Sequence, residues 1–437
     1  PLYWALLVPV VHAFDGIAAV RAMLVLCVLL HVLSGALLFR ALSRRFEALP
    51  AFAGAALWLV LPGARTIVVM GVESALLSCC LAGLLVVVLD PSPPTRRSAV
   101  LVGALVGLCY LARTDSPLVT LPLVAAWAWR GPQRNVAAAG RSIVTSGLVA
   151  LAVASPWLAY GASRGRPFAS DAFRAERLGT SVDLAVATAK RATAELYLLN
   201  GLEPLRARLG GNVTNLLVVV GFGIVAWMLV RRRDGIGLAG MAGPVVIFTA
   251  YAVAEGYMRD WYELYPFFAI CAFAVPAVIG APARRSVPAW VVPAAVAALL
   301  VVAVVLPNHA LNPQERDKWR AAPIAEALLA PDARVGAFNA GIYQFAMRQD
   351  VVNLDGVVNP EVLGPLRAGR LCDYLVDHGI DHLVDYRLYL DRAQAADPRL
   401  RFVDRIDLTA RYAPGGDRVD QRQELVTVDL TSCRAPR

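Results

Sequence analysis

Long apolar stretches alternate with short polar links along most of the chain, and this pattern predicts a bundle of membrane-spanning helices. Most of the stretches reach the roughly 20 residues that a helix needs to cross a bilayer. We place ten, at 20–42, 48–66, 68–90, 97–113, 116–131, 142–162, 212–231, 235–255, 261–281 and 287–306. The stretch at 116–131 is short, and Arg113, Asp115 and Pro117 around its start indicate a break or a re-entrant entry.

The pattern changes beyond residue 306, where short β-like runs replace the long apolar stretches. The runs lie at 334–338, 351–354, 382–384 and 425–430, with a helical stretch at 361–378. Such an alternation predicts a small α/β domain. The chain therefore divides into a helical membrane domain, residues 1–306, and a C-terminal α/β domain, residues 307–437.

Two segments of the helical domain do not fit a simple span. The polar segment 163–211 contains a helical pattern from Val182 to Leu199, which is typical either of an amphipathic helix on the outer surface or of a connector. Residues 2–14 are apolar but too short to cross a bilayer. Tyr3 and Trp4 favour a helix that lies at the headgroup level.

Arginine clusters occupy every second link, and they predict the orientation of the chain, because short basic loops stay in the cytoplasm. The clusters are Arg40/Arg44/Arg45, Arg96/Arg97, Arg130/Arg134/Arg141, Arg231/Arg232/Arg233 and Arg284/Arg285, and the links between them hold Asp15, Glu73, Asp115, Glu255, Asp260 and Glu263. We therefore expect these acids, and the α/β domain, on the outer face. If residues 20–42 cross from the outside to the inside, the chain must first have reached the outside. We therefore expect a further transmembrane helix before Pro1.

The composition supports a membrane protein rather than a soluble one. The chain is 58% hydrophobic and 17% charged, with a mean hydropathy of +0.56, whereas soluble domains are nearer 45–50% apolar and about 25% charged. The net charge of +9 lies mostly in the arginine-rich links, where it meets anionic lipid headgroups. We therefore expect the lipid bilayer, and no nucleic acid, as a partner.

The cysteines and histidines show no metal-site spacing. Cys27, Cys79, Cys80, Cys109 and Cys271 lie within apolar stretches, where we interpret them as small packing residues. Cys372 and Cys433 are the two cysteines of the α/β domain, where oxidation is permitted, and the sequence leaves their pairing open. We expect His31, inside a span, to be packed or hydrogen-bonded rather than a ligand.

Two acidic segments could bind a substrate on the outer face. Glu73, two residues after Gly71, could bind sugar hydroxyls or position an acceptor, or it could simply stabilise a helix N-terminus. Arg113-Thr114-Asp115-Ser116 could bind a ligand, or it could form an internal ion pair at the start of the next span.

The densest polar link is 255–263, which holds Arg259, Asp260, Tyr262 and Glu263. An arginine suits phosphate oxygens, and aromatic rings suit the apolar face of a sugar or an isoprenoid. The alternative is an aromatic belt with incidental charges. In the α/β domain, 338–343 and 352–356 follow predicted strands, and their Asn and Asp residues fit either a function or a turn.

Several short motifs resemble the type C glycosyltransferase superfamily of polytopic membrane enzymes. They are Pro1-Leu2-Tyr3-Trp4, Gly71-Val72-Glu73-Ser74, Leu111-Ala112-Arg113-Thr114-Asp115 and Asn353-Leu354-Asp355-Gly356. They are similar to the "PLxYW", "GMET" and "TRPDG" segments of that superfamily and to the exported tail of its bacterial members. Among subfamilies, the chain looks closest to actinobacterial and related enzymes near the arabinofuranosyltransferases and protein mannosyltransferases.

The resemblance implies transfer of a hexosyl or pentosyl group from a polyprenyl-phosphate donor to a glycan, lipid or protein acceptor on the outer face of a bacterial plasma membrane. Glu73, Arg113, Asp115, Arg259, Asp260, Tyr262 and Glu263 are then the expected substrate-binding residues. The superfamily's usual catalytic carboxylate precedes the "PLxYW" helix, so we expect it upstream of Pro1. Many relatives have an arginine four residues before a proline after the late outer loop. Tyr262 holds that position before Pro266, which leaves Arg259 as a displaced candidate for the phosphate.

No cofactor is identified from the sequence, and its metal dependence is undetermined. A nucleotide-binding glycine loop is absent from the sequence, which is consistent with a lipid-linked donor. The alternative functions are a transporter or flippase of lipid-linked sugars, or a non-catalytic subunit of an envelope assembly complex. No inverted repeat of the kind that many transporters carry is visible in the sequence, which favours the enzyme.

Overall fold

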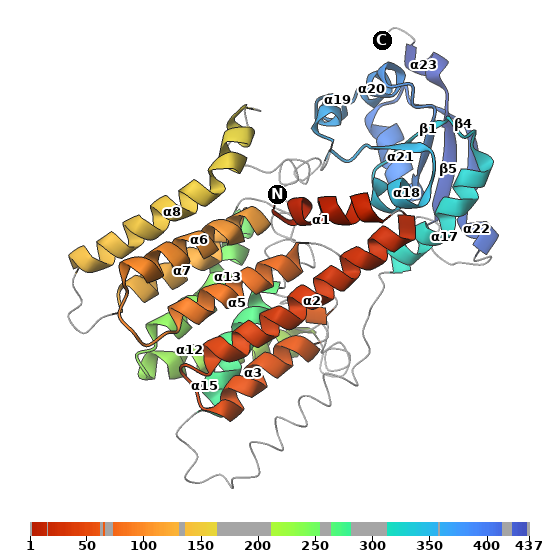
Figure 1. Ribbon diagram of the computed structural model, residues 1–437. Helices are drawn as coiled ribbons and strands as arrows, with labels where there is room; N and C mark the ends of the chain where they lie inside the picture. Colours follow the sequence, from red (N-terminus) through yellow and green to blue (C-terminus); the bar gives the residue numbers. More distant parts are fainter. Residues whose placement is uncertain are drawn as a thin grey trace. The chain divides into compact units, whose positions relative to one another are not determined.

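The chain forms two compact units (Figure 1). The computed structural model describes residues 2–14, 16–61, 64–65, 73–130, 136–163, 211–253, 264–280, 313–356, 359–412 and 422–434. The first unit contains the described helices up to residue 279, and the second contains the described elements from residue 313 onward.

The first unit is entirely helical among its described residues. Its elements are α1 (Leu2–Ala13), α2 (Gly16–Leu42), α3 (Ala48–Val60), α5 (Ser74–Val88), α6 (Arg96–Ala112), α7 (Pro117–Ala128), α8 (Val136–Ser163), α12 (Gly211–Arg231), α13 (Gly235–Val253), α14 (Leu264–Ala269), the π-helix η3 (Ile270–Ala274) and α15 (Val275–Ile279). From α2 to α15, the helices lie on the predicted stretches between 20 and 281, although α3 ends at Val60 rather than 66 and α8 begins at Val136 rather than 142. The stretch at 287–306 and the helical pattern from Val182 to Leu199 lie outside the described residues.

By length and composition alone, two helices in the described part of the chain could cross a membrane. They cover Ala18–Leu42, with 25 residues, and Val136–Ser163, with 28 residues. The other apolar helical segments found there are shorter, with 10–17 residues, and they include Val220–Arg231 of α12 and Gly235–Ile247 of α13. One of them is α7, which has 12 residues and contains Pro122, in agreement with the short stretch expected at 116–131. The count of ten crossings stays a prediction.

The arginines of two predicted links, Arg44/Arg45 and Arg130, meet at one end of the helical unit. Arg44 pairs with Asp90 at 2.5 Å and donates to the Val86 carbonyl, and Arg45 pairs with Asp234 at 2.6 Å. Arg130 donates to the carbonyls of Val88, Asp90 and Ser92, and so satisfies exposed carbonyl groups at the C-terminus of α5. We call this the arginine end. Our sequence interpretation overlooked Asp90 and Asp234, which are acids that lie among the arginines.

Helices α6 and α8 pack closely through two glycines of α6. Gly103 and Gly107 have the small-xxx-small spacing that lets transmembrane helices approach each other. A Cβ atom on Gly103 would meet the Ser146 carbonyl oxygen of α8, and one on Gly107 would lie 2.7 Å from the Val153 Cβ. The Ser146 hydroxyl adds a hydrogen bond of 2.9 Å to the Ala99 carbonyl. This contact therefore needs glycine at both α6 positions.

Gly103→Ala is expected to destabilise the helical unit by about 1–3 kcal/mol, the usual cost of overpacking a tight contact. Gly147→Ala on α8 is the matched control, because a Cβ atom there has nothing within 4 Å. It should leave stability unchanged or raise it slightly through helix propensity. Thermal unfolding of the detergent-solubilised protein measures both. Equal midpoints for the two variants would contradict this account of the α6–α8 contact.

The second unit is an α/β domain built on a five-stranded sheet (Figure 1). The strands are β1 (Arg334–Ala337), β2 (Asp350–Asn353), β3 (His382–Tyr386), β4 (Phe402–Asp407) and β5 (Gln423–Val428), in the order β2-β1-β3-β5-β4. β1 is parallel to β2 and β3, whereas β5 is antiparallel to β3 and β4. The helices are α17 (Pro313–Leu328), α18 (Ala340–Ala346), η5 (Pro360–Val362), α19 (Leu363–Arg367), α20 (Leu371–Asp377), α21 (Arg387–Ala396), α22 (Thr409–Tyr412) and α23 (Leu430–Arg434).

Both faces of this sheet are covered. Leu383 and Val384 are neighbours in β3, yet they belong to two separate apolar clusters. Alternate residues of a strand point to opposite faces, so each face has a cluster of its own. The helical stretch expected at 361–378 is divided into η5, α19 and α20, because Gly369 takes a positive φ of 60° between the last two.

Two features that the sequence left open are resolved in this domain. Cys372 and Cys433 form a disulfide that links α20 to α23. The segment 352–356 makes a turn, since the Asp355 N–H donates to the Asn353 side chain and Gly356 has a positive φ of 79°.

Candidate functional site

Four side chains from four helix ends meet in the helical unit and form the candidate site. Glu73 directly precedes α5, Arg113 follows α6, Asp115 precedes α7, and Tyr265 lies at the start of α14. We call these four residues the carboxylate cluster. Because Asp90 follows the other end of the 15-residue helix α5, the cluster and the arginine end lie about 22 Å apart along that helix. The outward orientation of the cluster stays a prediction.

Arg113 is the centre of the cluster. Its Nε and Nη2 atoms donate to the two oxygens of Asp115, at 3.2 and 3.0 Å, and its Nη1 donates to Glu73 at 3.1 Å. The Arg113 side chain is only 5% exposed, compared with 11% for Asp115 and 31% for Glu73. The two-pronged contact with Asp115 fixes the plane of the guanidinium, which a single contact would not do.

The local sequence explains why Arg113 can turn back toward these acids. α6 ends at Ala112, and Arg113 has extended backbone angles, with φ −145° and ψ 125°. The Ser116 N–H donates to the Arg113 carbonyl at 3.1 Å, which closes a tight turn. Pro117 then starts α7 at a position where a missing N–H costs nothing. This short turn places Arg113 and Asp115 side by side.

Tyr265 completes the cluster, and our sequence interpretation missed it. Its hydroxyl donates to Asp115 Oδ1 at 2.7 Å, and its ring lies 5.9 Å from the Arg113 guanidinium carbon. Only 1% of Tyr265 is exposed. The contact with Asp115 spans 150 positions in the chain, so no local pattern could reveal it. The one available signal was a tyrosine directly before Pro266 at the start of an apolar helix.

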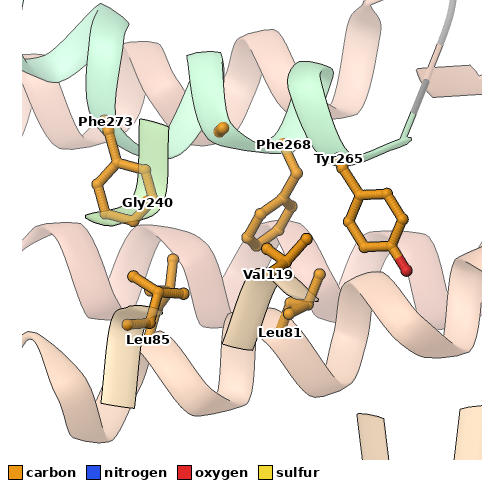
Figure 2. Close-up of a pocket in the computed structure, with 9 residues that line it drawn as sticks. Leu81, Leu85, Val119, Gly240, Tyr265, Phe268 and Phe273 are labelled. Atoms are coloured by element: carbon orange, nitrogen blue, oxygen red, sulfur yellow. The ribbon is translucent and has the colours of Figure 1, made fainter. Parts of the chain in front are cut away.

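A small apolar pocket lies beside Tyr265, between α5, α7, α13, α14 and η3 (Figure 2). Figure 2 shows the Tyr265 ring next to Phe268, with its hydroxyl directed away from Phe268. Leu81 and Val119 contribute to the same lining, and Phe273 packs where Gly240 leaves room for its ring. Tyr265 therefore has one apolar side in the pocket and one polar atom in the carboxylate cluster.

The structure shows how three of the predicted residues, Glu73, Arg113 and Asp115, are paired. Arg113 and Asp115 do form the internal ion pair that the sequence allowed. Glu73 occupies the N-cap position of α5 but makes no capping hydrogen bond with its side chain, which pairs with Arg113 instead. Arg259, Asp260, Tyr262 and Glu263 lie outside the described residues, as do Asp15 and Glu255. His31 is hydrogen-bonded to the Leu59 carbonyl and packs on Trp58, as expected.

The charge of the cluster limits what it can bind. Two carboxylates stand against one guanidinium, so these four side chains carry a net charge of −1. Such a site is suited to the hydroxyl groups of a sugar more than to a phosphate, because a carboxylate accepts hydrogen bonds and repels anions. Among the described residues, no group of three or more His, Cys, Asp or Glu side chains could hold a metal ion.

No protein-family model matches the chain, and no curated protein matches it either. Solved structures do match. The apo crystal structure of ArnT from Cupriavidus metallidurans aligns with a TM-score of 0.56 and 16% identity, over 96% of this chain and 85% of ArnT. The cryo-EM structure of the arabinofuranosyltransferase AftD from Mycobacteria aligns with a TM-score of 0.36 and 14% identity, over 94% of this chain and 34% of AftD.

The ArnT alignment shows that the chain shares the fold of ArnT. At 16% identity the likeness extends to the fold alone. The AftD alignment has a lower TM-score, and we draw no inference from it.

Proposed function

We propose that this protein is a multi-pass glycosyltransferase of a bacterial plasma membrane, which moves a sugar from a polyprenyl-phosphate donor to an envelope glycan, lipid or protein acceptor. In this proposal the carboxylate cluster and the α/β domain face the outside of the cytoplasm. The fold shared with ArnT supports the enzyme class, and the four motifs quoted above support the same superfamily.

The observation that carries the proposal is the carboxylate cluster itself. Buried charges are costly in a membrane domain and are retained mainly where they pair or function. Here all three charged side chains are paired, and Arg113 is buried and Asp115 largely so, whereas Glu73 remains 31% exposed and within reach of a ligand. We assign Glu73 to a hydroxyl group of the transferred sugar or of the acceptor, because a carboxylate is a strong acceptor for hydroxyl donors.

The phosphate of the donor needs a cation, and we assign that role to Arg259. Asp260, Tyr262 and Glu263 belong to the same link and are proposed to complete the substrate-binding surface. An aromatic ring such as that of Tyr262 suits the apolar face of a sugar or an isoprenoid. No resident cofactor is part of the proposal.

Sugar transfer from a radiolabelled polyprenyl-phosphate sugar, measured in membranes that contain the full-length gene product, tests the function. Arg259→Ala should lower kcat/KM by about tenfold or more, the effect of losing one charge-assisted hydrogen bond to phosphate. Arg232→Ala, in a predicted cytoplasmic link, serves as the control and should leave transfer unchanged. Absence of transfer from every polyprenyl-phosphate sugar tested, with a lipid-linked sugar instead crossing the membrane, would favour the flippase.

A further inference from the structure

The buried end of the carboxylate cluster contains more hydrogen bonds than a simple ion pair needs. Arg113 and Asp115 already satisfy each other through two hydrogen bonds. Tyr265 adds a third hydrogen bond to the same carboxylate, from a helix 150 positions away. The Asp115 Oδ1 atom thus accepts from both Arg113 Nε and Tyr265 Oη, so its rotamer is fixed from two directions.

These contacts form one continuous series that ends at Glu73. Tyr265 holds Asp115, Asp115 holds two N–H groups of Arg113, and the remaining described bond of Arg113 goes from Nη1 to Glu73. A guanidinium is planar and rigid, so fixing one edge also fixes the direction of the opposite N–H groups. Tyr265 is 1% exposed and Glu73 is 31% exposed, so the series leads from the buried core to an accessible carboxylate.

Arg113 cannot serve well as a phosphate site in this arrangement. A phosphate near Arg113 would meet two carboxylates at hydrogen-bond distance from the same guanidinium. Like charges placed together disfavour binding, and here they outnumber the one positive charge. The described contacts of Arg113 therefore direct it toward Asp115 and Glu73.

We propose that Tyr265, Asp115 and Arg113 form a positioning relay that aims Glu73 at a sugar or acceptor hydroxyl, and that this relay makes no contact with the donor phosphate. The assignment of the hydroxyl rests on the proposed function above, whereas the relay itself is a statement about contacts. Tyr265 is a positioning residue, because it acts through Asp115 and Arg113. Its ring also lines the apolar pocket, so the buried packing of α14 determines where its hydroxyl lies (Figure 2).

The relay is tested by hydrogen–deuterium exchange on the full-length protein in lipid nanodiscs. Tyr265→Phe removes only the hydroxyl, and Arg113→Lys keeps the positive charge but loses the fork. Both should speed exchange of the Leu77 amide, which donates to the Glu73 carbonyl, by about tenfold, because Glu73 loses the arginine contact that anchors it. Tyr110→Phe removes a hydroxyl from α6 one turn before Arg113, outside the cluster, and should change nothing there. Unchanged exchange at the Leu77 amide in Tyr265→Phe overturns the relay.

Steady-state transfer on the same variants tests the separation from phosphate. Tyr265→Phe and Arg113→Lys should lower kcat for transfer by about tenfold, while inhibition by farnesyl phosphate, a soluble analogue of the leaving group, stays within about twofold of wild type. Inhibition weakened about tenfold or more in Arg113→Lys would show a phosphate contact and overturn this part of the proposal. If the wild-type protein transfers no sugar, the proposed function fails, while the exchange measurement still decides the relay.

Discussion

Glu73→Gln is expected to lower kcat/KM for sugar transfer by about tenfold to a hundredfold, the effect of losing a charged acceptor for a substrate hydroxyl. Glutamine has nearly the shape of glutamate, and its amide oxygen can still accept from Arg113. The negative charge that strengthens a hydrogen bond from a hydroxyl group is lost. Transfer from a radiolabelled polyprenyl-phosphate sugar, with the donor and the acceptor varied separately, measures the change and shows which substrate Glu73 contacts.

The same helix offers a matched control. Asp90→Asn makes the same type of change at the other end of α5, where Asp90 pairs with Arg44 at the arginine end. It should leave kcat/KM unchanged, because the arginine end lies about 22 Å from the carboxylate cluster along that helix. Similar losses in Glu73→Gln and Asp90→Asn would show that the activity depends on the integrity of α5 and not on the Glu73 carboxylate.

The helical domain could be predicted from sequence because its signal is local. Apolar stretches of the right length identify α2, α8 and α12 without knowledge of any neighbour. Pro117 and the polar residues around it correctly marked the short helix α7. The sequence also suggested the Arg113–Asp115 pair, since the two residues are only two positions apart.

The rest of the site depends on contacts between distant positions. Tyr265 meets Asp115 across 150 residues, and Arg113 meets Glu73 across 40. A single sequence carries no record of such pairs. Tyr265 also resembles the many aromatic residues that occur at membrane interfaces, so its type alone did not distinguish it. Our sequence interpretation therefore gave most weight to the link 255–263, where charged residues are closest together.

The α/β domain could also be predicted only in part, but for a different reason. The sequence predicted β1, β2, β3 and β5 because each contains an apolar run. These strands are apolar because helices cover both faces of the sheet there. β4 was missed, since Phe402–Asp407 contains three charged residues among three apolar ones without a regular alternation, lies at the edge of the sheet and is only partly buried. Edge strands commonly carry such charges, which prevent pairing with another chain. The charged residues that protect β4 from pairing with another chain also make it hard to recognise as a strand in the sequence.

Arg113→Met should have the largest effect on stability. It keeps a side chain of similar length but removes the one positive charge of the carboxylate cluster. Asp115, with 11% of its side chain exposed, would remain as a buried carboxylate without its cation. Removing one partner of a buried ion pair costs about 3–5 kcal/mol. We expect a clearly lower unfolding midpoint in detergent and no measurable transfer.

A second substitution separates the electrostatic cause from simple loss of packing. In Arg113→Met/Asp115→Asn the buried carboxylate becomes a neutral amide, whose oxygen can still accept from the Tyr265 hydroxyl. Replacing both charged partners is far less costly than removing one, so the double variant should recover more than half of the lost stability. Transfer should stay lower than in the wild type by about tenfold to a hundredfold, as in Glu73→Gln, because Glu73 no longer has an arginine to hold it. A double variant no more stable than Arg113→Met would mean that the methionine disturbs the packing around Tyr265. A double variant with restored transfer would mean that Glu73 needs no positioning by Arg113.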